Sequence, residues 1–336
     1  MNKIYFDQLY NLPTKERYLN NFNDKTKLAY ERILKRASKI ERKLNCDLYN
    51  FNLEQIKQLL YLLNSTVQST VASSVNVVKN YIKWAIEQDL RTDNINPLDA
   101  VSTGDFYKKF VDVSENTFFS ESEINQIVKK CVNYQDKAVI QGLFEGMNGR
   151  RYSELLNAKV EHIQVNDEII EMELFEDSDS GIESRKIEIS NDLYHILKEA
   201  ALEEEYVKNN GLLKSYTRKA TNELTKSEFI LRTAVTTRAT TKQGNVASGP
   251  LVIRRVEKMS DIYSLSKLTP TNIRKSGMLK MAKDLYLERG VLDRDEYNII
   301  CRHFNNGKPI NGNYKYSRLK SDFLNIENIK LLYGLN

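Results

Sequence analysis

Apolar side chains recur at three- and four-residue intervals along roughly the first hundred residues, a spacing that places them on one face of an α-helix. The pattern predicts amphipathic helices over residues 30–44, 53–63 and 67–85. The apolar positions of the third helix are Val67, Val71, Val75, Val78, Ile82 and Ala85. The pair Asn96-Pro97 ends this run, because a residue before proline disfavours helical backbone. A linker is expected at 102–104.

A second unit begins near residue 118. Ser120 and Glu123 have the spacing of a capping box, in which two side chains satisfy free N–H groups at a helix start. Helical spacing follows over 124–131 and 139–147, and again over 193–200 and 273–285. Alternating apolar residues at 170–174 and 187–189, around a turn at 177–181, predict a β-hairpin. The fold is thus expected to be mainly α with a small antiparallel β-sheet, in two domains over 1–112 and 113–336.

Composition excludes several classes of protein. The 336 residues are 41% hydrophobic and 28% charged, which suits two soluble globular domains. No apolar run approaches the ~18 residues of a membrane span, and the N-terminus has no apolar segment typical of a signal peptide. The three cysteines lie far apart, without metal-ligand spacing. We therefore expect a protein of the reducing cytoplasm with no membrane contact, no metal and no cofactor.

Charge is distributed unevenly along the chain, although the net charge is only +5. Residues 168–183 hold seven acidic residues and no basic one, whereas residues 210–260 hold ten Lys or Arg against three Glu. This segregation indicates a basic face that binds a phosphate backbone. A solvated lysine-rich loop is an equal alternative from charge alone. Residues 233–250, rich in Thr, Gly and Ser, are expected to form an extended insertion.

Three short motifs along the second unit carry the candidate chemistry. The first is the run Gly-Arg-Arg-Tyr-Ser-Glu-Leu-Leu at 149–156, and the second is Thr-Asn-Ile-Arg-Lys-Ser-Gly at 271–277. The pair Arg302-His303 follows, and then Tyr314 and Tyr316. Together with a helical domain that ends in Asn-Pro and a capped helix before the first motif, this order resembles the tyrosine recombinases, the phage-integrase family. The resemblance extends from about residue 21 to the end of the chain.

The resemblance implies a two-domain clamp around double-stranded DNA. In that family two arginines hold the scissile phosphate, and Arg151 and Arg274 match them. Paired guanidinium groups suit this task, because their planar N–H donors match phosphate oxygens. A tyrosine attacks the phosphorus and a lysine on the hairpin turn, assisted by histidines, protonates the leaving oxygen.

The chain departs from the family pattern at the groups that transfer protons. Thr271 stands where the family has histidine, and the hairpin turn at 176–181 is acidic instead of carrying a lysine. Lys186 on the return strand could substitute, but it comes late, and Tyr314 and Tyr316 have no clear counterpart as nucleophile. Losing a general acid commonly costs a factor of about 10²–10⁴ in rate. We therefore expect that strand cleavage has been lost, so that no residue is catalytic.

DNA contacts are expected from both domains, with phosphate contacts setting position and base-edge contacts setting sequence. The expected set is Arg151, Arg274, Lys275, Arg302 and His303 around one phosphate, Arg150 as a further DNA contact, Arg254 and Arg255 along the backbone, and Thr70, Ser73, Ser74 and Lys79 in the major groove. If His303 is not a phosphate donor, it is a histidine at a helix end. His162 and His195 are expected to be structural, and Trp84 to belong to the core.

Two functions are consistent with these features: a DNA-binding repressor on an inactive scaffold, or an active integrase with a diverged site. An accessory factor for a partner recombinase is a third, weaker alternative. The missing general acid favours the repressor. The Lys- and Asn-rich composition is typical of an AT-rich Gram-positive host or its phage, and the chain resembles the recombinase-like master repressors of SPβ-type Bacillus phages. The resemblance implies a repressor that maintains lysogeny by binding operator DNA. We expect such a protein to be associated with the nucleoid of the bacterial host, to form a homo-oligomer on DNA and to have a regulatory protein as a further partner.

Overall fold

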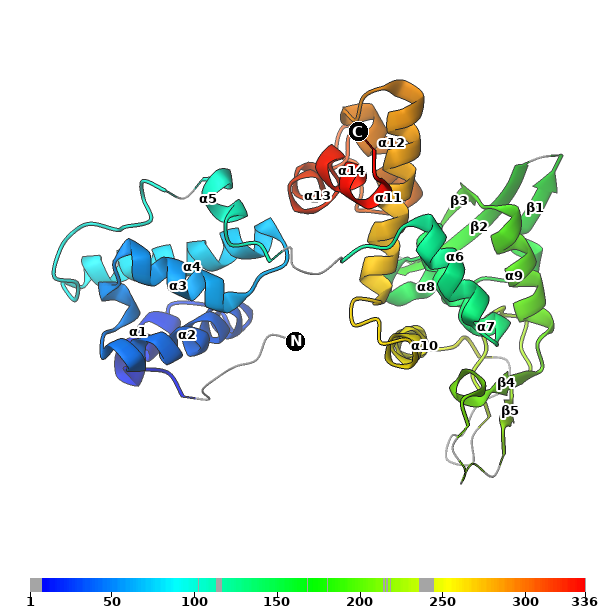
Figure 1. Ribbon diagram of the computed structural model, residues 1–336, viewed down its shortest axis with the longest axis horizontal. Coiled ribbons are helices and arrows are strands. Elements are labelled where there is room, and N and C mark those ends of the chain that lie inside the picture. The colour runs from blue at the N-terminus through cyan, green and yellow to red at the C-terminus, as the bar shows by residue number, and fades with distance from the viewer. Residues whose placement is uncertain are drawn as a thin grey trace. The chain divides into compact units, whose positions relative to one another are not determined.

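Buried apolar side chains form two separate cores in the computed structural model of the protein. Figure 1 shows the helices and strands that carry them. The structure describes residues 8–335 except 102, 113–116, 168, 180, 214, 216, 218 and 236–244. One unit comprises Met1–Glu115 with Ser321–Phe323, and the other Asn116–Lys320 with Leu324–Asn336. The short C-terminal piece in the first unit is not anticipated by a division at residue 112.

The first unit is helical, and the three helices predicted from periodicity are present. Its helices are α1 (Leu12–Leu19), α2 (Asp24–Leu44), α3 (Leu53–Leu63), α4 (Gln68–Glu87) and α5 (Gly104–Lys108). The apolar stripe of α4 is buried, as its spacing requires. Helix α5 lies partly in the predicted linker, because the Thr103 hydroxyl accepts a hydrogen bond from the Phe106 amide and caps it. Trp84 packs against this core, as predicted.

A buried ionic cluster fixes α4 within the first unit. The Lys15 ammonium lies 2.6 Å from a Glu41 carboxylate oxygen and 3.4 Å from one of Asp47, and the side chains of Lys15 and Glu41 are fully buried. The Tyr81 hydroxyl, on α4, donates to Asp47 at 3.0 Å. Because buried charges are tolerated only when paired and hydrogen-bonded, this cluster ties the position of α4 to α1 and α2.

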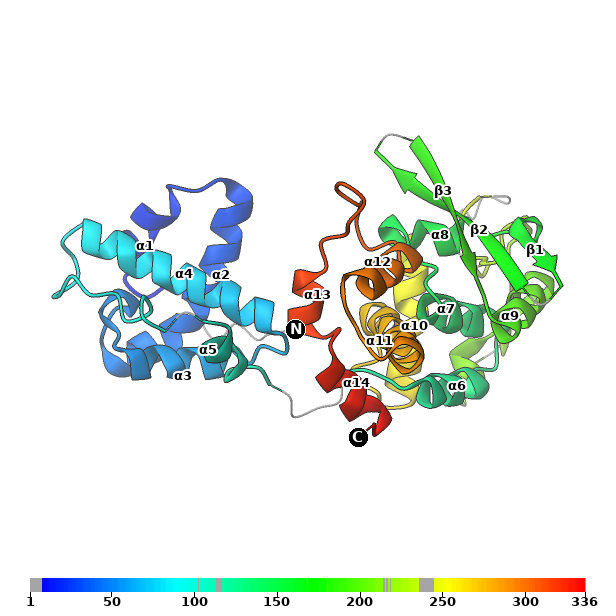
Figure 2. The ribbon, with the colours of Figure 1, turned by 90° about the horizontal axis from the view of Figure 1, so that it is seen from above.

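The second unit combines helices with small antiparallel sheets. Its helices are α6 (Glu121–Lys130), α7 (Tyr134–Phe144), α8 (Ser153–Leu156), α9 (Asn191–Leu202), α10 (Gly249–Ile262), α11 (Pro270–Arg289), α12 (Arg294–His303) and α14 (Ile326–Tyr333); α13 (Ser317–Asp322) leads into the C-terminal piece of the first unit. Helix α7 lies between α9 and α11 (Figure 2). The predicted capping box at Ser120 and Glu123 starts α6.

The predicted hairpin is part of a three-stranded sheet in the order β1 (Ile163–Asn166), β2 (Ile169–Ser178), β3 (Gly181–Glu188). Met172 pairs with Ile187, and both are buried on the inner face. Lys186 pairs with Glu173 on the opposite face, because side chains alternate along a strand. A second, two-stranded sheet joins β4 (Glu205–Val207) and β5 (Thr221–Glu223).

Helices α11 and α7 touch through their backbones at Gly277. A Cβ atom on Gly277 would lie 1.8 Å from the carbonyl oxygen of Phe144, a distance that no side chain can occupy. Glycine therefore sets how deeply α11 packs against the central helix, and Arg274 lies one helical turn before it.

The segment at 233–262 departs from the sequence-based expectation. The central part of the predicted insertion, 236–244, lies outside the described residues. Its last residues start helix α10, with Pro250 in the first turn and Val252, Val256 and Met259 buried at helical spacing. Of the ten basic residues of 210–260, Arg232 and Arg255 are buried and do not belong to a basic surface. Lys214, Arg218, Arg238 and Lys242 lie outside the described residues.

Candidate nucleic-acid interface

The first arginine motif is presented by an unusual turn. Gly149, Arg151 and Tyr152 all have positive φ, at 65°, 55° and 68°, before α8 begins at Ser153. This left-handed backbone is costly for residues with a Cβ atom and is typically retained at functional sites. Gly249 approaches from α10 so closely that a Cβ atom there would lie 2.8 Å from the Arg151 carbonyl oxygen. The Arg151 side chain is exposed on this turn.

Arg151 and Arg274 meet in one pocket, although they are far apart in sequence. The pocket has a volume of about 710 Å³, and Thr271 lines it with the two arginines. Helix α11 carries both Thr271 and Arg274 near its start, which is capped by the Thr269 hydroxyl and has Pro270 in its first turn. The structure thus brings together the two predicted phosphate ligands and the residue that replaces the histidine.

Two hydrogen bonds to the protein hold one terminal nitrogen of the Arg274 guanidinium. One terminal nitrogen donates to the carbonyl oxygen of Phe304 at 2.9 Å and to the Asn306 side chain at 3.0 Å. Its Nε has no hydrogen-bond partner among the described residues. Burial lowers the pKa of Arg274, yet arginine remains charged in proteins. A fixed, charged guanidinium at the pocket wall favours binding of an anion.

Sequence reasoning missed Arg185, which organises the base of the site. Its guanidinium forms a bidentate ion pair with the buried Glu154 carboxylate, at 2.6 and 2.7 Å, and donates to the carbonyl oxygens of His303 at 2.7 Å and Gly146 at 2.8 Å. Glu154 also accepts from the Asn148 amide at 2.8 Å. The first motif, the sheet and the end of α12 are therefore joined by one arginine, whose inner-face position on β3 follows from strand alternation.

His303 is placed differently from the phosphate contact expected for it. Its Nε2 lies 2.9 Å from the carbonyl oxygen of Glu145, and burial lowers the pKa of its imidazole. This placement agrees with the alternative of a histidine at a helix end. Arg302, the last-turn neighbour, is exposed, and Lys275 is partly buried. A contact of these two residues with phosphate stays a prediction.

The candidate proton donor and nucleophiles lie elsewhere. Lys186 is on the outer face of the sheet, where its ammonium reaches Gln164 at 3.2 Å and Glu171 at 3.8 Å, so its proposed role as a substitute acid is wrong for this arrangement. The Tyr316 ring stacks on Tyr297 with 4.5 Å between ring centres. The described residues that line the pocket do not include Lys186, Tyr314 or Tyr316.

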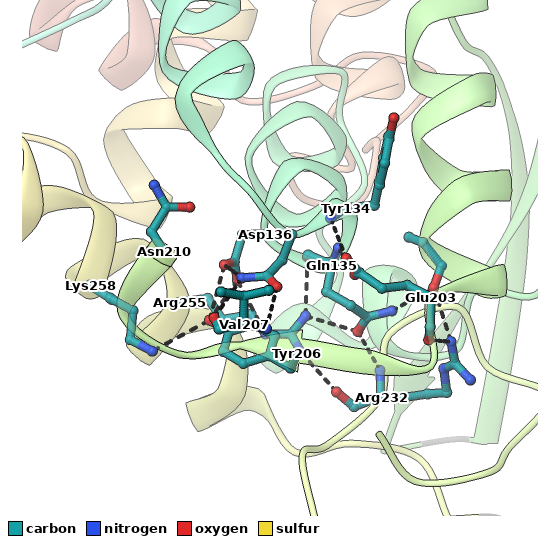
Figure 3. Close-up of polar contacts among 12 residues, drawn as sticks. Tyr134, Gln135, Asp136, Glu203, Tyr206, Val207, Asn210, Arg232, Arg255 and Lys258 are labelled. Carbon is teal, nitrogen blue, oxygen red and sulfur yellow. Dashed lines mark hydrogen bonds and ion pairs between the residues drawn. The ribbon is translucent and has the colours of Figure 1, made fainter. Parts of the chain in front are cut away.

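The expectation that Arg255 contacts DNA is wrong. Arg255 on α10 is only 5% exposed, and its guanidinium donates to Gln135 and to the Arg232 carbonyl oxygen (Figure 3). It lies 3.6 Å from the buried carboxylate of Asp136, which also accepts from the Tyr206 hydroxyl at 3.0 Å. Burial lowers the pKa of Arg255 and raises that of Asp136. Its neighbour Arg254 is exposed and remains a candidate.

Helix α4 presents a polar face that only partly matches the predicted one. Thr70 and Ser73 are exposed, but Ser74 is buried and donates to the Thr70 carbonyl oxygen at 3.0 Å, so its expected base contact is wrong. Lys79 is paired with Asp99 at 2.8 Å. Asn76 and Asn80 are exposed on the same face and were missed. Their four-residue spacing from each other, and three from Ser73, could have found them.

The described residues contain no helix long and apolar enough to cross a membrane, and no cluster of His, Cys, Asp and Glu that could hold a metal ion. The first unit is helical and the second combines helices with small sheets. Two arginine motifs of the second unit meet in one pocket. Together these features define a scaffold of the tyrosine-recombinase type.

The chain belongs to the MrpR family. The model of the MrpR C-terminal catalytic domain matches residues 118–334, and that of the MrpR N-terminal core-binding domain matches residues 9–87. Over 326 residues, 97% of each chain, it is 28% identical to the SPbeta prophage-derived uncharacterized protein YopR of Bacillus subtilis (strain 168).

Similarity to solved structures is more remote. A crystal structure of the XerH site-specific recombinase bound to difH substrate, a pre-cleavage complex, has a TM-score of 0.37 and 12% identity, covering 91% of this chain and 82% of that one. A post-cleavage complex of XerH with a palindromic difH substrate has a TM-score of 0.41 and 13% identity, covering 87% and 77%.

Proposed function

We propose that the protein is a sequence-specific double-stranded DNA-binding protein that does not cut DNA and acts as a phage repressor that maintains lysogeny. The observation that carries the proposal is the pocket in which Arg151 and Arg274 converge beside Thr271. Two guanidinium groups suit a phosphate anion. A threonine hydroxyl cannot exchange a proton near neutral pH as a histidine does.

Base recognition is assigned to the exposed face of α4. Thr70, Ser73, Asn76 and Asn80 offer neutral hydrogen-bonding groups along one side of a 20-residue helix, the element that fits a major groove. Asparagine can donate to and accept from one adenine edge simultaneously. The phage-derived relative YopR supports a role in prophage biology. We further propose that the protein forms homo-oligomers on its operator and that a regulatory protein releases it from the DNA.

The proposal is tested by incubating the protein with fragments of the genome that encodes it and sequencing the fragments that it retains. A repressor retains a few defined sites without changing the DNA. Retention of all fragments alike would contradict sequence specificity, and the appearance of cut ends would favour the alternative, an active recombinase with a diverged site.

Arg151→Ala is expected to weaken DNA binding by about 1.5–3 kcal/mol, because a charge-assisted phosphate contact is lost. Arg151 is preferred to Arg274 for this test, since it is exposed on its turn and Arg274 also holds Phe304 and Asn306. Titrations at several salt concentrations should show the slope of log affinity against log salt falling by about 0.9. Arg294→Ala, an exposed arginine outside the pocket, is the matched control. Equal effects of both variants would show that the pocket has no special role.

Suicide substrates with a nick beside the binding site are expected to trap no covalent protein–DNA adduct. Tyr314→Phe and Tyr316→Phe should each leave operator affinity nearly unchanged, because a hydroxyl that attacks nothing contributes at most one hydrogen bond, about 0.5–1.5 kcal/mol. Denaturing gel electrophoresis of labelled DNA detects an adduct directly. A reproducible adduct that one of these substitutions abolishes would establish the recombinase alternative.

A further inference from the structure

The acidic end of strand β2, just before the β2–β3 turn, is hydrogen-bonded to the first arginine motif and its surroundings. A Glu176 carboxylate oxygen accepts a hydrogen bond from the Arg150 amide at 2.5 Å, and its other oxygen accepts from the Asn305 side chain at 2.6 Å. The Asp177 carboxylate accepts from the Asn157 side chain at 3.2 Å. These hydrogen bonds hold the end of β2 beside the motif.

Asp179, the last acidic residue before the tip, makes the contact of most consequence. Its carboxylate forms an ion pair with the Arg150 guanidinium, and this contact lowers the pKa of Asp179. The Arg150 side chain is 51% exposed and that of Asp179 is 90% exposed. Both residues line a second pocket of about 390 Å³, together with Arg151, Asp177 and the Ser248-Gly249 start of α10, and of its two carboxylates Asp179 is the one paired with an arginine. A carboxylate therefore occupies a place among cationic groups that a phosphate oxygen would suit.

We propose that Asp179 is a built-in competitor for DNA phosphate. In the free protein its carboxylate holds the Arg150 guanidinium, and DNA must displace it before Arg150 can contact a phosphate. This inference rests on the proposed function, since it assumes that duplex DNA reaches the arginine motif. It gives the acidic turn a role in setting affinity, beyond the absence of a general acid.

The exposure of the ion pair determines how strong this competition is. An exposed pair is screened by water and salt and is broken at little cost. Asp179 therefore reduces the affinity without closing the site. Its displacement by a phosphate also leaves a carboxylate that recruits a cation, which opposes the counterion release that drives DNA binding. The competition should thus be visible both in the affinity and in its dependence on salt.

The test measures binding of the 336-residue chain to a labelled random-sequence duplex by fluorescence anisotropy. Asp179→Asn should bind about two- to five-fold more tightly than the wild type, and the slope of log affinity against log salt should steepen by up to about 0.9. Asp177→Asn is the matched control: it makes the same change of charge two residues away in the same pocket, but Asp177 is bonded to an asparagine and not to an arginine. It should show a smaller gain and no steepening.

A second comparison separates the ion pair from the general field of the turn. In an Arg150→Ala background, Asp179→Asn should lose most of its effect, because the cation that it frees is absent. Equal gains for the two Asn variants, or a gain that persists without Arg150, would overturn the competitor role and leave DNA binding itself intact. A wild-type protein that binds no duplex at low salt would instead contradict the proposed function, and this inference with it.

Discussion

Arg255→Met is expected to lower the free energy of unfolding of the second unit by about 3–5 kcal/mol, because the buried carboxylate of Asp136 loses the arginine that is ion-paired with it. Asp136 is 1% exposed, so water cannot replace the lost partner. The main-chain carbonyl oxygens of Gln135 and Arg232 would lose a donor as well. Removing one member of a buried ionic pair typically costs more than the pair contributes when intact.

Urea unfolding followed by circular dichroism measures this change. Arg254→Met is the matched control, since the neighbouring arginine is exposed, and surface substitutions usually change stability by no more than about 0.5 kcal/mol. Trp84 is the only tryptophan and belongs to the first unit, so its fluorescence transition should not move. A stable Arg255→Met protein with weakened DNA binding would restore Arg255 as a DNA contact.

Lys15→Met is expected to destabilise the first unit by a similar amount, about 3–5 kcal/mol, because the carboxylates of Glu41 and Asp47 then share a buried site without a cation. Here the Trp84 fluorescence transition should move to lower urea, since its ring packs against Tyr81, the α4 residue bonded to Asp47. DNA binding should weaken with it, because this cluster positions α4.

The loss of stability caused by Lys15→Met should depend on pH. Burial raises the pKa of Glu41 from 4.5 to about 7. A carboxyl group with a raised pKa contributes stability that is fully present below pH 4.5 and is lost as pH rises through about 7. Lys15→Met should therefore be less destabilised at pH 5 than at pH 8, since a protonated Glu41 needs no cation. Lys57→Met, which removes a partly exposed partner of Glu54, is the control and should show little change at either pH. Equal losses of Lys15→Met at both pH values would contradict the role of Glu41.

Local patterns predicted the elements of the fold wherever one face of an element is buried. The stripe of α4, the capping box of α6 and the alternation of β2 and β3 each encode their own structure. Helix α10 was missed because its basic residues suggested a solvated segment, although Val252, Val256 and Met259 have helical spacing. Pro250, which follows Ser248 and Gly249, is as typical of the first turn of a helix as it is of a loop.

Only those site residues that belong to the recognised sequence motifs could be predicted. The pairing of Arg151 with Arg274 followed from a family resemblance, and the structure brings both into one pocket. Contacts that depend on tertiary packing could not be predicted from the sequence. Arg255, for example, is buried against Asp136, which lies far away in sequence. In the same way, the contact between Asp179 and Arg150 exists because the hairpin folds back on the motif. Charge counts along a chain do not distinguish a buried arginine from an exposed one.

The backbone contact at Gly277 has a genetic consequence. Any side chain there must push α11 away from Phe144, and Arg274, one turn earlier on the same helix, would move with it. A random mutagenesis screen for loss of DNA binding should therefore recover substitutions at position 277, although glycine has no side chain that could contact DNA. Second-site revertants of Gly277→Ala should map to α7, where a local shift of the backbone around Phe144 can make room for the added methyl group.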